Sequence, residues 1–344
     1  MTEPARRLTP VVRLAPAKVN LTLAVVGRRA DGFHDLHSVV VPLALADRLS
    51  LAIRASGPDS LHVTGFDTGP RADNLVLRAI AATRAAVAGS WPGAPAPPPP
   101  LAARLEKRVP VAAGLGNGSS DAAATIDAAA EAWGAELAPE VRLRIAAALG
   151  SDVPLFLAGG IALIEGRGER VTSLAGVRSE PPGLVLVTPA LPLSTAAVFA
   201  AFGASSGSGS TRLTSEHIAG ELRAGLRSAD LVARAGVLAV ANDLAPGAAM
   251  VAPELVPFRR SITRAVGRPV GLSGSGPTLW VLYPSLAAAE EAADELRSAI
   301  DAGGVAAAGS GPPFIAATTF APAATAPPSP DPPLPADTAR RKDA

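Results

Sequence analysis

The stretch that decides the fold runs from Pro110 to Ala124 and reads PVAAGLGNGSSDAAA. Its three glycines let the backbone approach a ligand closely with N–H groups turned inward. The two serines that follow begin a helix, and a helix N-terminus favours negative charge. The stretch has neither the Gly-Lys-Ser/Thr of a P-loop nor the spacing of a dinucleotide fingerprint. It predicts a phosphate-binding loop, and the alternative is an ordinary capped helix after a glycine turn.

Around this loop, strand and helix patterns are mixed without strict strand–helix–strand alternation, which favours an α+β fold over a doubly wound sheet. Strands are predicted at 11–26, 38–43, 49–53, 61–63, 101–107, 161–165, 170–174, 184–188, 270–273, 278–283 and 314–319. Helices are predicted from an Asn74 cap to residue 89, at 119–133, 139–150, from Pro154, and at 195–202, 214–226, 229–240, 254–266 and 286–302. Residues 91–100 are expected to form a loop, and 203–211 a flexible connector.

The segment RSEPPG at Arg178–Gly183 looks like a domain boundary, since proline and glycine interrupt regular structure there. We therefore predict an N-terminal domain at 9–180 and a C-terminal domain at 181–320. The tail at 321–344 consists mostly of Pro, Ala and charged residues, so we predict that it is disordered.

Composition excludes several classes of protein. The 344 residues include 31 Lys+Arg and 30 Asp+Glu, a net charge of +1, so no basic field is available to bind nucleic acid. Cysteine is absent, which excludes disulfides and thiolate metal sites, and the four histidines show no metal-ligand spacing. No apolar run approaches the roughly 20 residues of a membrane span, and the N-terminus does not resemble a signal peptide. We expect a cytoplasmic protein without membrane contact.

Two further segments place polar side chains where they could line a cleft. Strand alternation places Lys18, Asn20 and Thr22 on one face, which suits a polar cleft or, alternatively, a solvated strand face. In GSDVPLF at Gly150–Phe156, Asp152 precedes a proline that suits the first turn of a helix. Asp152 or Ser151 then caps this helix, and Asp152 is alternatively a carboxylate held in place beside a cation, where it stays ionised; the two roles do not exclude each other.

Two loops complete the set of candidate segments. GLSGSGPT at Gly271–Thr278 is either a tight hairpin or a second loop whose N–H groups approach a phosphate. His34 stands between an aromatic residue and an acid in DGFHDL at Asp31–Leu36, a setting usual for a surface loop.

Each segment has an ordinary explanation alone, but their order along the chain resembles the GHMP kinases over about Leu14 to Phe320. The segments are PAKVNL at 16–21, DGFH at 31–34, DNL at 73–75, the glycine loop at 110–123, GSDVP at 150–154 and GLSGSGPT at 271–278. PAKVNL, DGFH and GSDVP resemble in particular the branch that phosphorylates 4-diphosphocytidyl-2-C-methyl-D-erythritol. The resemblance implies a domain like the second domain of ribosomal protein S5, followed by a ferredoxin-like domain, with the active site between them.

The resemblance also implies a reaction, in which the γ-phosphoryl group of ATP moves to the 2-hydroxyl of the methylerythritol unit. Asp152 then accepts the hydroxyl proton, and Lys18 orients the hydroxyl and offsets charge on the transferred group. The residues implied in ATP binding are Asn74, Leu75, Lys107, Pro110, Val111, Ala112, Ala113, Gly114, Leu115, Gly116, Asn117, Gly118, Ser119 and Ser120. Those implied in substrate binding are Asn20, Phe33, His34, Thr195, Phe199, Gly274 and Ser275. Phe33 and Phe199 are expected to stack on both faces of the cytosine, with His34 at its edge.

Mg²⁺ is expected as the counter-ion of ATP, without a protein metal site written as a motif, and the protein is expected to be a monomer or a weak homodimer. Two residues depart from the family pattern. Asn117 stands where the loop usually has a glycine, and we expect it to be tolerated because Asn accepts positive φ better than most residues. Phe33 replaces the more usual Tyr. The alternatives are another GHMP kinase for a small alcohol such as mevalonate or homoserine, and an inactive ligand sensor on the same fold.

Overall fold

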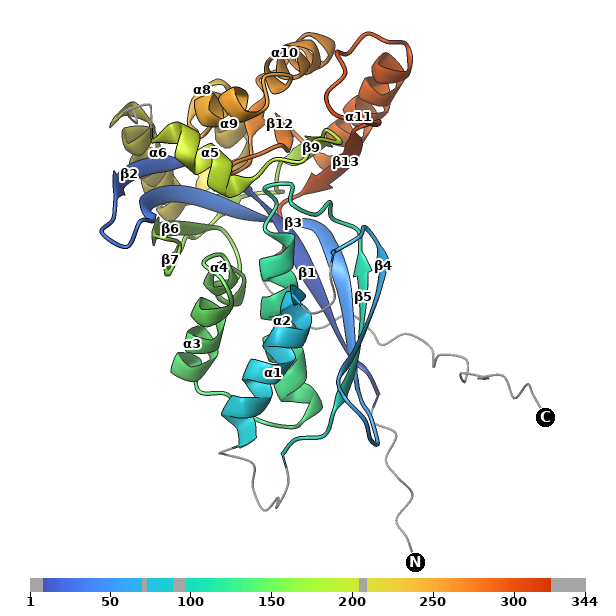
Figure 1. Cartoon of the computed structure of the whole chain (residues 1–344). Coiled ribbons are helices and arrows are strands. Elements are labelled where there is room, and N and C mark those ends of the chain that lie inside the picture. Colours follow the sequence, from blue (N-terminus) through green and yellow to red (C-terminus); the bar gives the residue numbers. More distant parts are fainter. Residues whose placement is uncertain (1–8, 70–72, 89–96, 204–208, 323–344) are drawn as a thin grey trace, which may run out of the picture.

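Two β-sheets with helices packed around them form the body of the protein (Figure 1). The computed structural model describes residues 9–69, 73–88, 97–203 and 209–322. The predicted loop at 91–96, the connector at 204–208 and the tail at 323–344 lie outside the described residues. Strands and helices are mixed without regular alternation, so the α+β prediction is confirmed.

The first sheet is organised around one strand, β3, which runs over 20 residues from His34 to Ile53. The other six strands are β1 (Val11–Asn20), β2 (Ala24–Arg28), β4 (Ser60–Gly65), β5 (Leu101–Lys107), β6 (Ala162–Gly166) and β7 (Arg170–Ser173). β3 pairs antiparallel with β1, β2, β5 and β6. The prediction of two separate strands at 38–43 and 49–53 is wrong, because the irregularity in pairing falls in β1, between Pro16 and Lys18, and leaves β3 continuous.

The single strand predicted at 11–26 is also divided. Between β1 and β2 the backbone of Leu23 leaves the sheet to pair with a distant segment: its N–H donates to the Ala241 carbonyl at 2.8 Å, and its carbonyl accepts from the Asp243 N–H at 2.9 Å. The Asp243 carboxylate then accepts from the Val25 N–H at 2.9 Å. The chain is therefore tied at this point to its C-terminal part.

Four helices cover one face of the first sheet: α1 (Leu75–Ala88), α2 (Asn117–Ala132), α3 (Pro139–Leu149) and α4 (Val153–Ala158) (Figure 1). The predicted Asn74 cap is confirmed, since its Oδ1 accepts from the Val76 N–H at 2.9 Å. α2 begins two residues earlier than predicted, at Asn117. Alanines make up much of its buried side, which lets the helix lie close to the sheet.

The second sheet has four antiparallel strands in the order β11 (Gly271–Leu272), β12 (Leu279–Tyr283), β9 (Gly183–Thr188) and β13 (Phe314–Thr319). The helices of this part are α5 (Thr195–Phe202), α6 (Gly209–Arg223), α7 (Ser228–Ala233), α8 (Ala235–Val240), α9 (Ala245–Val251), α10 (Leu255–Val266) and α11 (Leu286–Asp301). Two short strands, β8 (Val177–Arg178) and β10 (Leu226–Arg227), pair parallel. The helix predicted at 229–240 is two helices that meet at Arg234, α9 is an addition, and residues 209–211 belong to α6 rather than to a connector.

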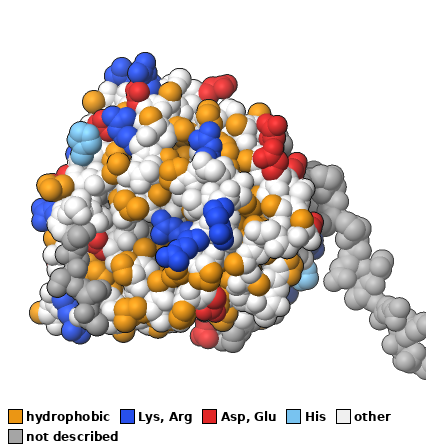
Figure 2. Space-filling model, turned by 90° about the horizontal axis from the view of Figure 1, so that it is seen from above, with side chains coloured by type: hydrophobic (Ala, Val, Ile, Leu, Met, Phe, Trp, Pro, Cys, Tyr) orange, Lys and Arg blue, Asp and Glu red, His pale blue; other side chains and the backbone are white. Residues whose placement is uncertain are grey.

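One hydrophobic core crosses the predicted boundary near residue 180. It joins Leu21 and Val41 of the first sheet to Leu184 and Trp280 of the second. Because the two parts share this core, the division of the chain into domains at 9–180 and 181–320 stays a prediction. On the face of the molecule seen in Figure 2, basic side chains lie in separate groups among apolar and neutral ones rather than in one continuous field.

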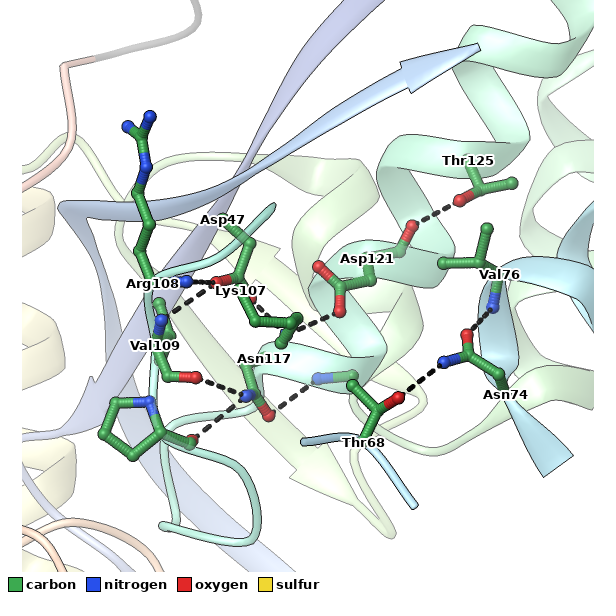
Figure 3. Close-up of polar contacts among 12 residues, drawn as sticks. Asp47, Thr68, Asn74, Val76, Lys107, Arg108, Val109, Asn117, Asp121 and Thr125 are labelled. Atoms are coloured by element: carbon green, nitrogen blue, oxygen red, sulfur yellow. Dashed lines mark hydrogen bonds and ion pairs between the residues drawn. The ribbon is translucent and has the colours of Figure 1, made fainter. Parts of the chain in front are cut away.

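A buried cluster of charges fastens α2 to the first sheet (Figure 3). The Lys107 ammonium on β5 donates to the Asp47 carboxylate on β3 and, at 2.7 Å, to Asp121 on α2. The other carboxylate oxygen of Asp47, Oδ1, accepts hydrogen bonds from the Arg108 and Val109 N–H groups at 2.6 and 2.9 Å. Asp121 Oδ1 has no partner in the described structure. Burial, opposed by Lys107, raises the pKa of Asp121 to about 7.

This raised pKa predicts that the protein becomes less stable as pH rises. Asp121 has a folded-state pKa above its ordinary value of 3.8, so the unfolded chain releases this proton first. The stabilisation is complete below about pH 4 and is lost as pH rises through about 7. We expect the variant Asp121→Asn to gain stability relative to the native protein between about pH 5 and pH 8, as measured by urea denaturation. A stability difference independent of pH would contradict this assignment.

Candidate active site

A cleft of about 1560 Å³ lies between the two sheets and is lined by residues of both parts. Most of the predicted site residues line it: Lys18, Asn20, Phe33, His34, Leu75, Ala112, Ala113, Gly114, Gly116, Asn117, Gly118, Ser119, Asp152, Thr195, Phe199, Gly274 and Ser275. The predicted residues that do not line it are Asn74, Lys107, Pro110, Val111, Leu115 and Ser120. The structure therefore brings the two predicted catalytic residues, the glycine loop and the predicted substrate residues to one place.

The glycine loop is held by the hairpin loop between β11 and β12. Ser273 Oγ donates to the Gly114 carbonyl at 3.0 Å, and the Thr278 N–H donates to the Ala113 carbonyl at 3.3 Å. Gly114 has a φ of 77°, and a Cβ there would lie 2.4 Å from the Ser273 carbonyl oxygen. Only glycine fits this approach. The segment Gly271–Thr278 is thus a hairpin, as the first interpretation has it, and it also forms part of the cleft wall; its approach to a phosphate stays a prediction.

Lys18 reaches the cleft floor from β1. It is 5% exposed, and its ammonium donates to Asn20 Oδ1 at 2.7 Å and to the Gly114 carbonyl at 2.9 Å. Asn20 in turn donates to Ser38 Oγ at 2.8 Å, which fixes its amide. Burial lowers the pKa of Lys18, and the nearby Asp152 carboxylate opposes that shift. The solvated-face interpretation of this strand is wrong, because its polar side chains are buried.

Asp152 stands at the start of α4, yet its carboxylate makes no capping hydrogen bond to the helix. The capping interpretation is therefore wrong. Its side chain lines the same cleft as Lys18, and its negative charge acts to raise the pKa of Lys18 against the larger effect of burial. A carboxylate that makes no capping bond can accept a proton from a group bound in the cleft.

Asn117 has a different role from the one expected. It is the first residue of α2, and positive φ values in the loop occur at Ala112, Gly114 and Gly116 instead. Its side-chain amide donates to the carbonyls of Val109 and Pro110, at 3.1 and 3.0 Å, and its oxygen accepts from the Gly118 N–H at 2.8 Å (Figure 3). The explanation by φ tolerance is wrong. The side chain instead joins the two ends of the glycine loop.

The aromatic residues at the other end of the cleft are paired differently from the predicted sandwich. The His34 ring stacks on Phe199, with centroids 5.1 Å apart and planes inclined by 25°. Phe33 is 54% exposed, and the Arg167 guanidinium lies over its ring at 4.9 Å from the centroid. Burial and the nearby Arg28 lower the pKa of His34, so the ring is neutral at neutral pH. A neutral imidazole can both donate and accept a hydrogen bond.

Two predicted ATP-binding residues lie apart from the main cleft. Asn74 lines a separate pocket of about 340 Å³ beside Phe66 and Gly65, and its amide donates to Thr68 Oγ1 at 3.3 Å (Figure 3). Lys107 is buried in the ion cluster described above, so its ammonium is not available in the cleft. The adjoining Leu75 does line the main cleft.

Sequence reasoning missed several groups at the site. Ser273 holds the glycine loop, and Asn242 donates to the carbonyls of Leu272 and Gly274, at 2.9 Å each. Arg28 and Arg167 also line the cleft. The only signal for Arg167 was its place between two glycines. Ser273 and Asn242 are recognised only from contacts in the folded structure, which span 159 residues for Ser273 and Gly114 and 30 to 32 residues for Asn242.

Two kinds of feature are absent from the described residues. No cluster of three or more His, Asp or Glu side chains in that part of the chain could hold a metal ion. Within the same residues, no helix combines the length and apolar character needed to cross a bilayer.

Two family models match the chain. The model of the GHMP kinases N terminal domain matches residues 74–160, which contain the glycine loop and Asp152. The model of the GHMP kinases C terminal domain matches residues 222–302, which contain the Gly271–Thr278 hairpin.

Full-length relatives and solved structures agree with these models. The chain is 39% identical to the 4-diphosphocytidyl-2-C-methyl-D-erythritol kinase of Pelotomaculum thermopropionicum, over 83% of this chain and 94% of that protein. It is 40% identical to the enzyme of the same name from Methylorubrum extorquens, with the same shares covered.

A crystal structure of 4-(cytidine 5'-diphospho)-2C-methyl-D-erythritol kinase matches with a TM-score of 0.65 and 33% identity, covering 90% of this chain and 100% of that one. Homoserine kinase from Cytophaga hutchinsonii matches with a TM-score of 0.64 at 18% identity, covering 93% and 97%, which shows a shared fold alone. The extent and identity of the matches show that the chain is a GHMP kinase and belongs to the 4-diphosphocytidyl-2-C-methyl-D-erythritol kinase family.

Proposed function

We propose that the protein transfers the γ-phosphoryl group of ATP to the 2-hydroxyl of 4-diphosphocytidyl-2-C-methyl-D-erythritol, a step in the formation of isoprenoid precursors by the non-mevalonate pathway. The observation that carries this proposal is the buried Lys18 ammonium. It donates a hydrogen bond to the Gly114 carbonyl in the glycine loop and lies in the same cleft as Asp152, whose carboxylate makes no capping hydrogen bond to α4. Family membership supports the choice of acceptor.

In this mechanism the cleft positions two substrates and moves one proton. The glycine loop and the start of α2 bind the phosphates of ATP, because their N–H groups and helix dipole favour negative charge. The acceptor hydroxyl attacks the γ-phosphorus, the bond to the β–γ bridging oxygen breaks, and ADP leaves. Asp152 accepts the hydroxyl proton, while Lys18 orients the hydroxyl and offsets charge on the transferred group.

Mg²⁺ is proposed to enter with ATP and to neutralise charge on its phosphates. One candidate ligand lies just behind the cleft lining, next to Ser119 at the start of α2. The Ser120 hydroxyl is buried and has no hydrogen-bond partner in the described structure. This oxygen would be a ligand of the kind that Mg²⁺ prefers.

Two further properties remain proposals. A cytoplasmic location is supported by the proposed substrates, since ATP and a nucleotide-linked alcohol are charged and do not cross membranes freely. A monomer or weak homodimer is supported by the cleft, whose lining includes both proposed catalytic residues of a single chain.

The choice of acceptor is tested by an ADP-release assay with 4-diphosphocytidyl-2-C-methyl-D-erythritol, mevalonate and homoserine under identical conditions. We expect the cytidylyl acceptor to have the highest kcat/KM. Preference for mevalonate or homoserine would overturn the proposed substrate while leaving the kinase assignment in place. No ADP release with any acceptor would favour an inactive ligand sensor.

The role of Asp152 is tested by the variant Asp152→Asn. General-base catalysis contributes on the order of 10²–10⁴ in rate, so kcat should fall by about that factor. The melting temperature should change little, because no capping bond is lost. Asp301→Asn is a matched control, since Asp301 is exposed at the end of α11 and does not line the cleft. Turnover of Asp152→Asn near the native value would show that Asp152 is not the base.

The loop-joining role of Asn117 is tested by Asn117→Ala. Loss of one such hydrogen bond costs about 0.5–1.5 kcal/mol, so the KM for ATP should rise about twofold to thirteenfold if one bond's worth of loop order is lost. The KM for the acceptor should change much less, because Asn117 joins segments on the ATP side of the cleft. A lower melting temperature with an unchanged KM for ATP would mean that Asn117 only stabilises the fold.

A further inference from the structure

We propose that Arg167, assisted by Arg28, binds the diphosphate group that joins the base and the alcohol of the acceptor, and thereby selects nucleoside diphosphate acceptors over simple alcohols. Both side chains line the cleft. The proposal rests on the proposed function and adds two specificity-determining residues to it.

The backbone of Arg167 is fixed beside the proposed base. Arg167 lies in the turn between β6 and β7, flanked by Gly166 and Gly168 with φ values of 68° and 120°. Its N–H donates to Glu169 Oε2 at 2.6 Å. A Cβ on Gly168 would lie 2.9 Å from the Ser151 carbonyl oxygen, so this turn packs directly against the residue that precedes Asp152.

The side chain of Arg167 extends from that turn to the aromatic end of the cleft. Its guanidinium carbon lies 4.9 Å from the centre of the Phe33 ring. A guanidinium stacked on a ring keeps its N–H groups free at the edge, where they can meet a phosphate in bidentate fashion. Arg167 therefore connects the place where the hydroxyl reacts with the place where the base is proposed to bind. A diphosphate must cross this interval.

Arg28 supplies a second cation at the same end. It is the last residue of β2 and lies directly opposite His34 in the ladder with β3. His34 stacks on Phe199, so Arg28 borders the aromatic group from the other strand. The lowered pKa of His34, which has Arg28 among its causes, agrees with this proximity.

Arg28 and Arg167 differ from the neighbouring Arg29 in having no carboxylate partner within the described residues. Arg29, next to Arg28, binds Asp31 at 3.2 Å and Asp35 at 2.9 Å. Within the described residues, neither Arg28 nor Arg167 makes a side-chain hydrogen bond or an ion pair with a carboxylate. Asp31 is the carboxylate that interacts with Arg167 at longer range, and it is already engaged by Arg29. Arg167, between the proposed base site and the reactive hydroxyl, and Arg28, at the aromatic end, together match the charge of a diphosphate.

The experiment measures binding of CDP and of cytidine, in the presence of saturating ADP to occupy the ATP site. The variants are Arg167→Gln and Arg28→Gln. Arg170→Gln is the matched control, because Arg170 starts β7 in the same hairpin, is exposed and does not line the cleft. We expect Arg167→Gln to weaken CDP binding about tenfold or more, as for loss of a charge-assisted bidentate contact, and Arg28→Gln to weaken it less. Cytidine binding should change less than about twofold, and the control should behave as the native protein.

Three outcomes would overturn the proposal. Equal losses for CDP and cytidine would mean that Arg167 acts through the Phe33 ring rather than on the diphosphate. A fall in kcat with unchanged CDP binding would assign Arg167 to the transferred phosphoryl group. Unchanged CDP binding and turnover would leave the two arginines without a role in the acceptor site. Failure of the proposed function is distinguishable, because the native enzyme itself would then neither bind CDP nor phosphorylate the cytidylyl acceptor.

Discussion

The site depends on one close approach, between the backbone at Gly114 and the hairpin loop that begins at Ser273. A single methyl group at Gly114 would overlap the Ser273 carbonyl, so the two halves of the protein can meet at this distance only through glycine. The Gly114 carbonyl accepts from both Ser273 and Lys18. One peptide group therefore sets the position of the glycine loop, the C-terminal wall of the cleft and the proposed catalytic ammonium together.

The charges around that contact are arranged so that the cleft is poised for negative ligands. Lys18 loses hydration on burial, and its partners Asn20 and Gly114 are neutral, so only Asp152 opposes the desolvation. Lys107, by contrast, is saturated by two carboxylates under α2. One buried lysine thus fastens a helix, and the other, Lys18, is the one proposed to act in catalysis; two carboxylates bind the first, whereas the hydrogen-bond partners of the second are neutral.

Local patterns in the sequence predicted the elements well where propensity and capping decide them. The Asn74 cap and the limits of β13 and α5 follow from local sequence alone. The continuity of β3 did not, because its pairing depends on a bulge in another strand. The site residues were brought together by resemblance rather than by local physics, and Asn117 shows the difference. The sequence shows that an asparagine stands at this position, but its hydrogen bonds to the Val109 and Pro110 carbonyls depend on the folded shape of the loop.

The N-terminal and C-terminal parts are joined by the bridge between Leu23 and Asn242 and by a shared core, and this has a consequence for folding during synthesis in the cell. Leu21 and Val41 pack in a core that also needs Leu184 and Trp280, so the first sheet has an unfilled apolar surface until most of the chain has left the ribosome. Contacts between residues so far apart in sequence form slowly, and exposed apolar surface in the meantime promotes aggregation. The N-terminal part is therefore expected to complete its core only after the C-terminal part has been synthesised.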